Sequence, residues 1–187
     1  MITFLGDEYT TVQIGEQCWF QENLRYLPSI HPGEFSSTNP RYYVYGYDDL
    51  DLVSAKQTES YLNHGALYNW PAAMQEGICP VGWHLPTAEE LMVLVETSNG
   101  VVAPAGELVS LEELFSGPFE GSLSGVVGAD GVDIEGSEGT QMWLWTQDGT
   151  SEGDMAHSLS VYAGIIGYLQ NEAVSMGQSI RCIQDSE

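Results

Sequence analysis

Three short acidic segments of the chain carry side chains whose type and spacing could bind a metal ion. The segments are 48–51, 130–135 and 148–154, and each lies beside glycine or small polar residues. Calcium takes oxygen ligands from carboxylates and from backbone carbonyl groups, which such segments can turn toward an ion. None of the three has the spacing of an EF-hand loop. We expect calcium ligands at Asp130, Asp133, Glu135, Asp148 and Asp154, with a second site at Asp48, Asp49 and Asp51.

The net charge supports a role for cations. The 187-residue chain contains 27 Asp and Glu but only 4 Lys and Arg, which gives a charge of -23. Nucleic acid and anionic membrane surfaces are excluded as partners, because both bind through clustered Lys and Arg. Repulsion between carboxylates destabilises a compact fold, and either high salt or a bound divalent cation relieves it. We expect a saline or extracellular setting in which calcium has a role; the alternative is an acidic surface of solvated turns that only keeps the protein soluble.

A tyrosine-rich segment, residues 42–47, is the second candidate feature. It lies within residues 28–65, which are rich in Pro, Gly, Ser and Asn, and loops of that length are usually functional or mobile. Tyrosine offers a large contact area with few rotatable bonds, which suits a recognition surface. The equally weighted alternative is an edge strand whose alternate tyrosines pack inward.

Motifs of the common enzyme classes are missing from the sequence. It contains no GxSxG, no P-loop and no GxGxxG after a strand. Pairs of acids as in glycosidases arise by chance among 27 acidic residues, so they carry little information. No CxxC, HxxxH or HExxH spacing is present, which argues against zinc. We therefore expect a protein without enzyme activity, and we expect His84 to be a buried hydrogen-bonding residue.

Local patterns predict the elements that must position these groups. Alternating residues on both sides of Gly15-Glu16 predict a hairpin over 9–20. Thr87 and Glu90 form a capping box for a helix that ends at Asn99-Gly100. Further short helices are expected from Pro71 to Met74 and from Ser110 to Phe115, and further strands at Leu123–Val127, Gln141–Thr146, His157–Tyr162, Ile165–Leu169 and Ser179–Ile183. Two or three short helices in the middle, with strands at both ends, predict one α+β domain over residues 1–187. No run of 18 apolar residues is present, so we expect no membrane insertion.

Several separated motifs resemble successive blocks of one family, the Fibrobacter succinogenes major paralogous domain of bacterial secreted and surface proteins. These motifs are residues 9–24, 65–74, 79–91, 143–146 and 177–182, and the Cys-Pro-Val-Gly-Trp-His-Leu-Pro-Thr run at 79–87 belongs to the most specific block. The resemblance implies a C-type lectin-like fold, related to formylglycine-generating enzymes, with antiparallel strands and long loops. It also implies that the motif tryptophans are core anchors and that Asn23 is a buried hydrogen-bonding residue. The oxidases of the wider fold use reactive cysteines or copper, and this chain has no matching cysteine pair near its C-terminal end.

Together with the acidity, these motifs resemble the ligand-binding domains of calcium-dependent RTX adhesins of marine bacteria. That resemblance implies a monomeric extracellular module of a much larger bacterial surface protein, with calcium as cofactor. Its partner would be a short peptide with a free C-terminal carboxylate on another cell; the alternatives are a calcium-dependent lectin that binds cell-surface glycans and a spacer without ligand.

Lectin-like folds usually bind ligands with their long loops. We therefore expect residues 28–63 and 117–154 to build one calcium-organised pocket. Its binding residues would be Tyr43 or Tyr45 as an aromatic wall and Ser124 or Gln147 as hydrogen-bonding groups.

The three cysteines allow at most one intramolecular disulfide and leave one thiol. We expect a Cys79–Cys182 bond, because Cys79 opens a rigid turn and Cys182 lies on the closing strand, and an extracellular setting permits it. Cys18 would then be a buried free thiol; finding it cross-linked would contradict this pairing.

Overall fold

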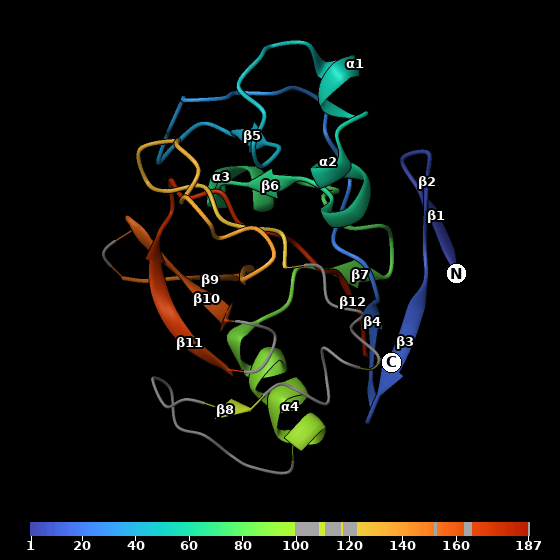
Figure 1. Ribbon diagram of the computed structural model, residues 1–187. Helices are drawn as coiled ribbons and strands as arrows, with labels where there is room; N and C mark the ends of the chain where they lie inside the picture. The colour runs from blue at the N-terminus through green and yellow to red at the C-terminus, as the bar shows by residue number, and fades with distance from the viewer. Residues whose placement is uncertain (100–108, 111–116, 118–122, 152, 163–165, 187) are drawn as a thin grey trace.

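Small antiparallel sheets and short helices build the fold (Figure 1). The structure is a computed structural model that describes all residues except 100–108, 111–116, 118–122, 152, 163–165 and 187. The strands are β1 (Ile2–Phe4), β2 (Asp7–Tyr9), β3 (Thr11–Ile14), β4 (Gln17–Phe20), β5 (Tyr42–Tyr43), β6 (Leu67–Tyr68), β7 (Trp83–His84), β8 (Val109–Ser110), β9 (Gln141–Gly149), β10 (Met155–Tyr162), β11 (Ile166–Ala173) and β12 (Ile183–Gln184). The helices are α1 (Leu52–Ala55), α2 (Glu59–His64), α3 (Trp70–Ala73) and α4 (Ala88–Asn99). This composition confirms the α+β class.

The hairpin of β3 and β4 and the C-terminal strand β12 lie in one sheet, whereas β1 and β2 form a separate pair. The strand order of the larger sheet is β3-β4-β12-β7, so that β12 lies between this hairpin and β7. The predicted hairpin is confirmed, with Ile14 paired to Gln17 across the turn. Gly15 has a φ of 60°, and a Cβ there would lie 2.7 Å from the Thr97 methyl group, so glycine is needed both for the turn and for its packing on α4.

The C-terminal sheet separates two parts of the hydrophobic core. Its order is β8-β11-β10-β9, and alternate residues of β9 point to opposite faces. Leu144 packs with Leu91 and Leu94 of α4, whereas Trp145 joins the larger cluster on the other face. The interior of the described part therefore has one core under α4 and a second under the long loops.

Helix α4 begins as its capping box predicts. The Glu90 amide donates to Thr87 Oγ1 at 3.1 Å, and the Thr87 amide donates to Glu90 Oε2 at 2.8 Å. Its apolar stripe is buried against the C-terminal sheet.

Among the described residues, no helix is long and apolar enough to cross a bilayer.

Three expected elements differ from the observed ones. Residues 123–127 make isolated bridges rather than a strand, because Gly125 has a φ of 74° and bends the chain. The expected strand 179–183 is reduced to β12, because residues 177–179 instead bridge to three separate segments. Ser110 belongs to β8, and the rest of the helix expected at 110–115 lies outside the described residues.

The disulfide links Cys79 to Cys182, as expected, with Cα atoms 5.9 Å apart. The expectation that Cys18 is buried is wrong, because its thiol is partly exposed. Cys18 pairs with Gln13 near the turn of the hairpin, and both residues line a polar groove.

The disulfide gives a first prediction. Replacing both Cys79 and Cys182 by alanine should lower the free energy of unfolding by about 4–5 kcal/mol, because the bond closes a loop of 103 residues in the unfolded chain. Urea unfolding of the variant and of wild type without any reductant, so that wild type keeps its disulfide, measures the difference. Cys18→Ala is the matched control and should change stability little; equal losses in both variants would contradict the prediction.

Candidate functional site

Two loops that are distant in sequence lie against each other and form what we call the loop junction, residues 42–48 and 124–138. The Tyr45 hydroxyl donates to the Ile134 carbonyl at 2.8 Å, and the Gly46 amide donates to Asp133 Oδ2 at 2.7 Å. A Cβ on Gly125 would lie 2.5 Å from the Tyr45 ring, so this ring covers a position that only glycine can occupy. The junction is therefore held by side-chain to backbone contacts from both loops.

Tyr43 is mainly a core residue of the junction. It is 2% exposed, and its hydroxyl donates to the Glu34 carbonyl at 2.8 Å. Its ring packs against Val127 and Gly177, and burial raises the pKa of its phenol well above the usual range. Tyr43 therefore packs inward, which was the alternative to a role in ligand binding, whereas Tyr45 is only partly buried.

A cavity of about 10 Å³ lies in the junction, which is the space that one water molecule or ion needs. The carboxylate residues Asp48 and Asp133 line it, together with the ring of Tyr47 and the backbone around Gly131. The sequence predicted one calcium-organised pocket built from residues 28–63 and 117–154, with Tyr43 or Tyr45 as a wall and with Asp48, Asp49 and Asp51 as a second metal site. The structure brings Asp48, Asp133 and Tyr43 together at this cavity.

Asp133 has an unfavourable electrostatic environment. Burial is the main cause that raises the pKa of its carboxyl group, and repulsion from Asp48 and Glu138 adds to the effect. The hydrogen bond from Gly46 only partly offsets it. In the described part of the chain, no Lys or Arg forms an ion pair with Asp133, since Arg25 pairs with Asp7 and Arg41 with Glu34. A bound cation would relieve the repulsion at this position.

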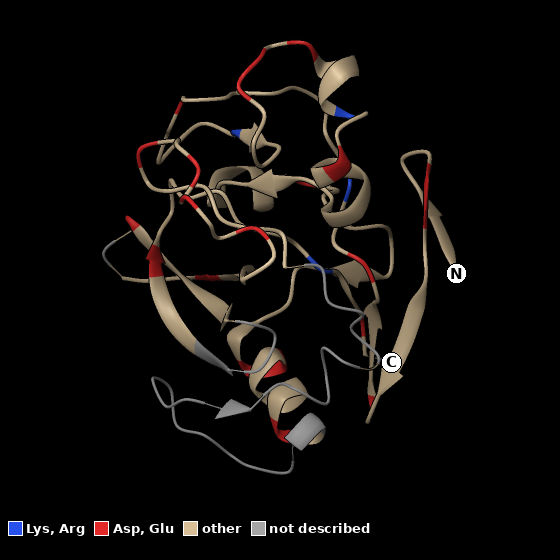
Figure 2. Cartoon of the chain, in the orientation of Figure 1, with Lys and Arg blue, Asp and Glu red and all other residues tan. Residues whose placement is uncertain are grey.

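Three other acids of the predicted calcium sites, Asp49, Asp51 and Asp130, accept hydrogen bonds within their own turns. Asp51 caps α1 by accepting from the Val53 amide, and hydrogen bonds from Ser54 and Val53 lower the pKa of its carboxyl group. Asp130 and Asp49 accept from nearby backbone amides, and Glu135 and Asp154 are exposed. Among the residues that the structure describes, no group of three or more Asp, Glu, His or Cys side chains could hold a metal ion. Figure 2 shows that acidic residues are nevertheless spread along both loops of the junction.

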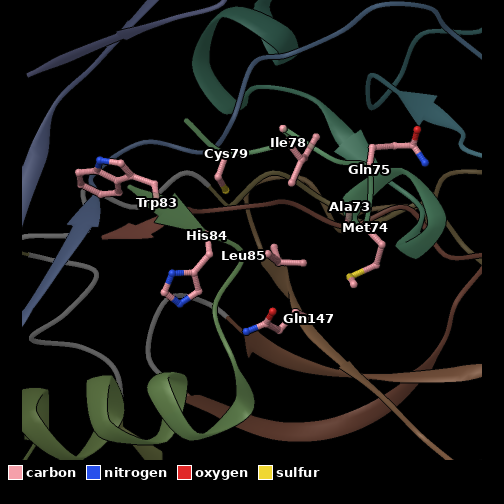
Figure 3. Close-up of a pocket in the computed structure, with 10 residues that line it drawn as sticks. Ala73, Met74, Gln75, Ile78, Cys79, Trp83, His84, Leu85 and Gln147 are labelled. Atoms are coloured by element: carbon pink, nitrogen blue, oxygen red, sulfur yellow. The ribbon is translucent and has the colours of Figure 1, made fainter. Parts of the chain in front are cut away.

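Three predicted binding residues, Tyr45, Ser124 and Gln147, do not line the junction cavity. Ser124 is 2% exposed, and its hydroxyl hydrogen bonds to the Ser179 hydroxyl at 2.8 Å, so it is part of the interior. Gln147 lines a different cavity, next to the disulfide, with His84 and Leu85 (Figure 3). These residues do not line one pocket, so the expectation of a single pocket is wrong.

His84 was expected to be buried, and the structure corrects this. Its side chain is 30% exposed, with Nδ1 2.6 Å from Asp185 Oδ1 and Nε2 3.0 Å from Glu90 Oε1. Ionised carboxylates only accept hydrogen bonds, so both contacts are hydrogen bonds only when both ring nitrogens carry hydrogen. The sequence did not reveal this arrangement, because Asp185 is distant from His84 along the chain.

The comparisons with known proteins identify one family. The family model described as the Fibrobacter succinogenes major domain matches residues 12–184. No curated protein and no solved structure matches the chain.

Asp148 gives a prediction that separates a structural role from a metal-binding role. Its Oδ2 accepts from the Ala88 amide at 2.6 Å, at the first turn of α4, where a negative charge is favourable. Asp148→Ala should therefore lower the free energy of unfolding by about 1 kcal/mol. Chemical denaturation should show the same loss in calcium and in chelator. Asp154→Ala removes an exposed acid of the same cluster and is the control; a loss that appears only in calcium would assign Asp148 to a metal site instead.

Proposed function

The chain belongs to the Fibrobacter succinogenes major domain family, and on that premise we propose that it is a calcium-dependent ligand-binding module of a bacterial surface adhesin. In this proposal the module has a C-type lectin-like fold, acts outside the cell as a monomer and binds short peptides at their C-termini. The observation that carries the proposal is the loop junction. There, Asp133 and Asp48 line an ion-sized cavity, and no basic side chain among the described residues neutralises Asp133.

Calcium at the junction would need ligands beyond these two carboxylates. Calcium takes six to eight oxygen atoms and accepts backbone carbonyl groups and water among them. Because three carboxylates do not converge in the described part of the chain, backbone groups of the two loops have to supply some of the remaining positions. The bound peptide can supply others through its terminal carboxylate.

A cation also explains how so acidic a protein can bind a carboxylate. With a charge of -23, the protein repels anions over its whole surface. A divalent ion is the largest local charge in such a site and reverses the sign of the potential around it. The ligand therefore binds to the ion and to the loops that hold it, without a nucleophile or a general base.

The alternative function is that of a calcium-dependent lectin. The partly exposed ring of Tyr47 favours it, because this ring lines the junction cavity beside Asp48. An aromatic ring next to a metal can cover the apolar face of a sugar while the ion binds its hydroxyl groups.

Asp133→Asn tests the proposed calcium site. Asparagine can still accept from the Gly46 amide, but it removes the buried charge. Because the pKa of Asp133 is raised in the folded state, its ionised form destabilises the calcium-free fold, and that cost disappears as the pH falls through the raised pKa. We expect the variant to melt at a higher temperature than wild type in chelator at pH 7, and the difference to shrink on acidification.

Calcium should raise the melting temperature of wild type much more than that of Asp133→Asn. An ion at 100 times its Kd stabilises wild type by about 2.7 kcal/mol, which corresponds to a rise in Tm of roughly 5–10 °C. Asp133→Asn should lose most of this rise, whereas Glu76→Gln, an exposed acid away from the junction, should keep it. Equal melting temperatures of wild type in chelator and in millimolar calcium would remove the calcium proposal.

The ligand class is tested with a peptide array and a glycan array, each with and without chelator. For a peptide that binds, amidation of its C-terminus should weaken binding at least tenfold, because a charge-assisted contact to the ion is lost. Tyr45→Phe, which removes the hydroxyl contact to Ile134 but keeps the ring over Gly125, should weaken binding less than Asp133→Asn. Unchanged binding of the amidated peptide would exclude carboxylate recognition, and calcium-dependent glycan binding would favour the lectin.

A further inference from the structure

The cavity next to the disulfide has features of a second binding site, and we call it the disulfide pocket. Its volume is about 200 Å³, and its walls include Met74, Ile78, Trp83, His84, Leu85 and Gln147. Cys79 of the disulfide forms part of the same wall. Figure 3 labels these side chains and shows that the Trp83 ring extends away from Met74, Leu85 and Gln147 in this view. The pocket shares no lining residue with the junction cavity.

The walls of the disulfide pocket are held in place before any ligand binds. Trp83 packs on Phe20, with ring centroids 4.9 Å apart, and the carboxylates of Asp185 and Glu90 fix the His84 ring. Ile78 and Leu85 are buried, and Cys79 is fixed by its covalent bond. A preformed pocket binds small groups better because little side-chain freedom is lost.

Met74 is the adaptable wall of the pocket. It is 44% exposed, and its unbranched thioether side chain can adjust to a bound group. Sulfur and aromatic rings attract one another, and so do aromatic rings in offset or edge arrangements. The side chains of Met74, Trp83 and His84 therefore favour an aromatic group over an aliphatic one.

The Gln147 side chain is available to form a hydrogen bond with a ligand. Both His84 nitrogens contact carboxylates, and the Gln75 side-chain amide donates to the Pro71 carbonyl. The side-chain amide of Gln147 has no hydrogen bond to another residue in the part of the chain that the structure describes, while its backbone amide donates to Pro86. A ligand group that donates or accepts one hydrogen bond fits this position.

We propose that the disulfide pocket binds a neutral, ring-sized aromatic group with one hydrogen-bonding substituent, which contacts Gln147. The size agrees, because a protein cavity of roughly 150 Å³ accommodates benzene. Neutral groups are favoured because acids surround the pocket: Glu90 and Asp185 contact His84, and Asp148 follows Gln147. The aromatic group comes either from a free small molecule or from a peptide side chain.

The test uses phenol, toluene and N-acetylphenylalaninamide as probes of the complete chain. Two-dimensional ¹H–¹⁵N NMR follows the indole N–H of Trp83 and the side-chain amide of Gln147. We expect phenol to shift both signals with a Kd on the order of 1 mM, in calcium and in chelator alike. Shifts from phenol alone assign the site to free small molecules, and shifts from phenol and the capped amino acid assign it to peptide side chains. No shift from either overturns the proposal.

Variants locate the binding to this pocket. Gln147→Leu should weaken phenol binding roughly five- to tenfold and leave toluene binding unchanged, because only the hydrogen bond is lost. Met74→Trp should fill the pocket and abolish the shifts, whereas Met74→Leu should keep them; thermal melting checks that both variants fold. Unaltered phenol binding by Met74→Trp, or equal losses for phenol and toluene in Gln147→Leu, would overturn the assignment.

Discussion

The hydrogen bonds of one segment, residues 177–185, connect many parts of the described structure; residues 177–183 are buried, and Gln184 and Asp185 are exposed. Backbone groups that are removed from water must form hydrogen bonds within the protein. Those of this segment bond to residues of β4, β6 and β9 and of three loops. Its partners are Val127, Tyr68, Trp143, Trp145, Leu24, Phe20 and Gly82. Its last strand, β12, then pairs with β4 and β7. The N-terminal hairpin, the loops and the C-terminal sheet are therefore positioned relative to one segment at the end of the sequence.

The same segment contains a buried basic residue in a chain that has few. Arg181 is fully buried, its Nε donates to Asn23 Oδ1 at 2.7 Å, and burial lowers the pKa of its guanidinium group to about 9. It still carries its charge at neutral pH. Because the chain has only 4 Lys and Arg, and Arg25 and Arg41 are paired with acids, little positive charge remains to neutralise the surface. Repulsion among the carboxylates of the acidic loops therefore has little compensation from basic side chains, and salt would screen it.

Both candidate binding regions depend on this central segment. At one end, Gly177 lies beneath the Tyr43 ring and bonds to Val127, which supports the loop junction. At the other end, Cys182 forms the disulfide whose partner lines the pocket, and Asp185 fixes His84. The irregular loops can therefore present defined surfaces although they contain few regular elements. Their shape is set by contacts to the segment beneath them.

Sequence patterns alone determined the features that depend on neighbouring residues or on the family motifs. The hairpin turn at Gly15, the capping box at Thr87, the α+β class and the Cys79–Cys182 bond were all predicted, because turn and cap chemistry acts within a few residues and the cysteines lie at a turn and at the closing strand. Only the tertiary structure determined which residues the acidic and polar side chains contact. Asp133 reaches the loop of Gly46, Asp148 caps a helix that begins 60 residues earlier, and Ser124 is buried against Ser179. The spacing of acids in a sequence does not predict these contacts, because each joins residues that are far apart along the chain and that only the folded structure brings together.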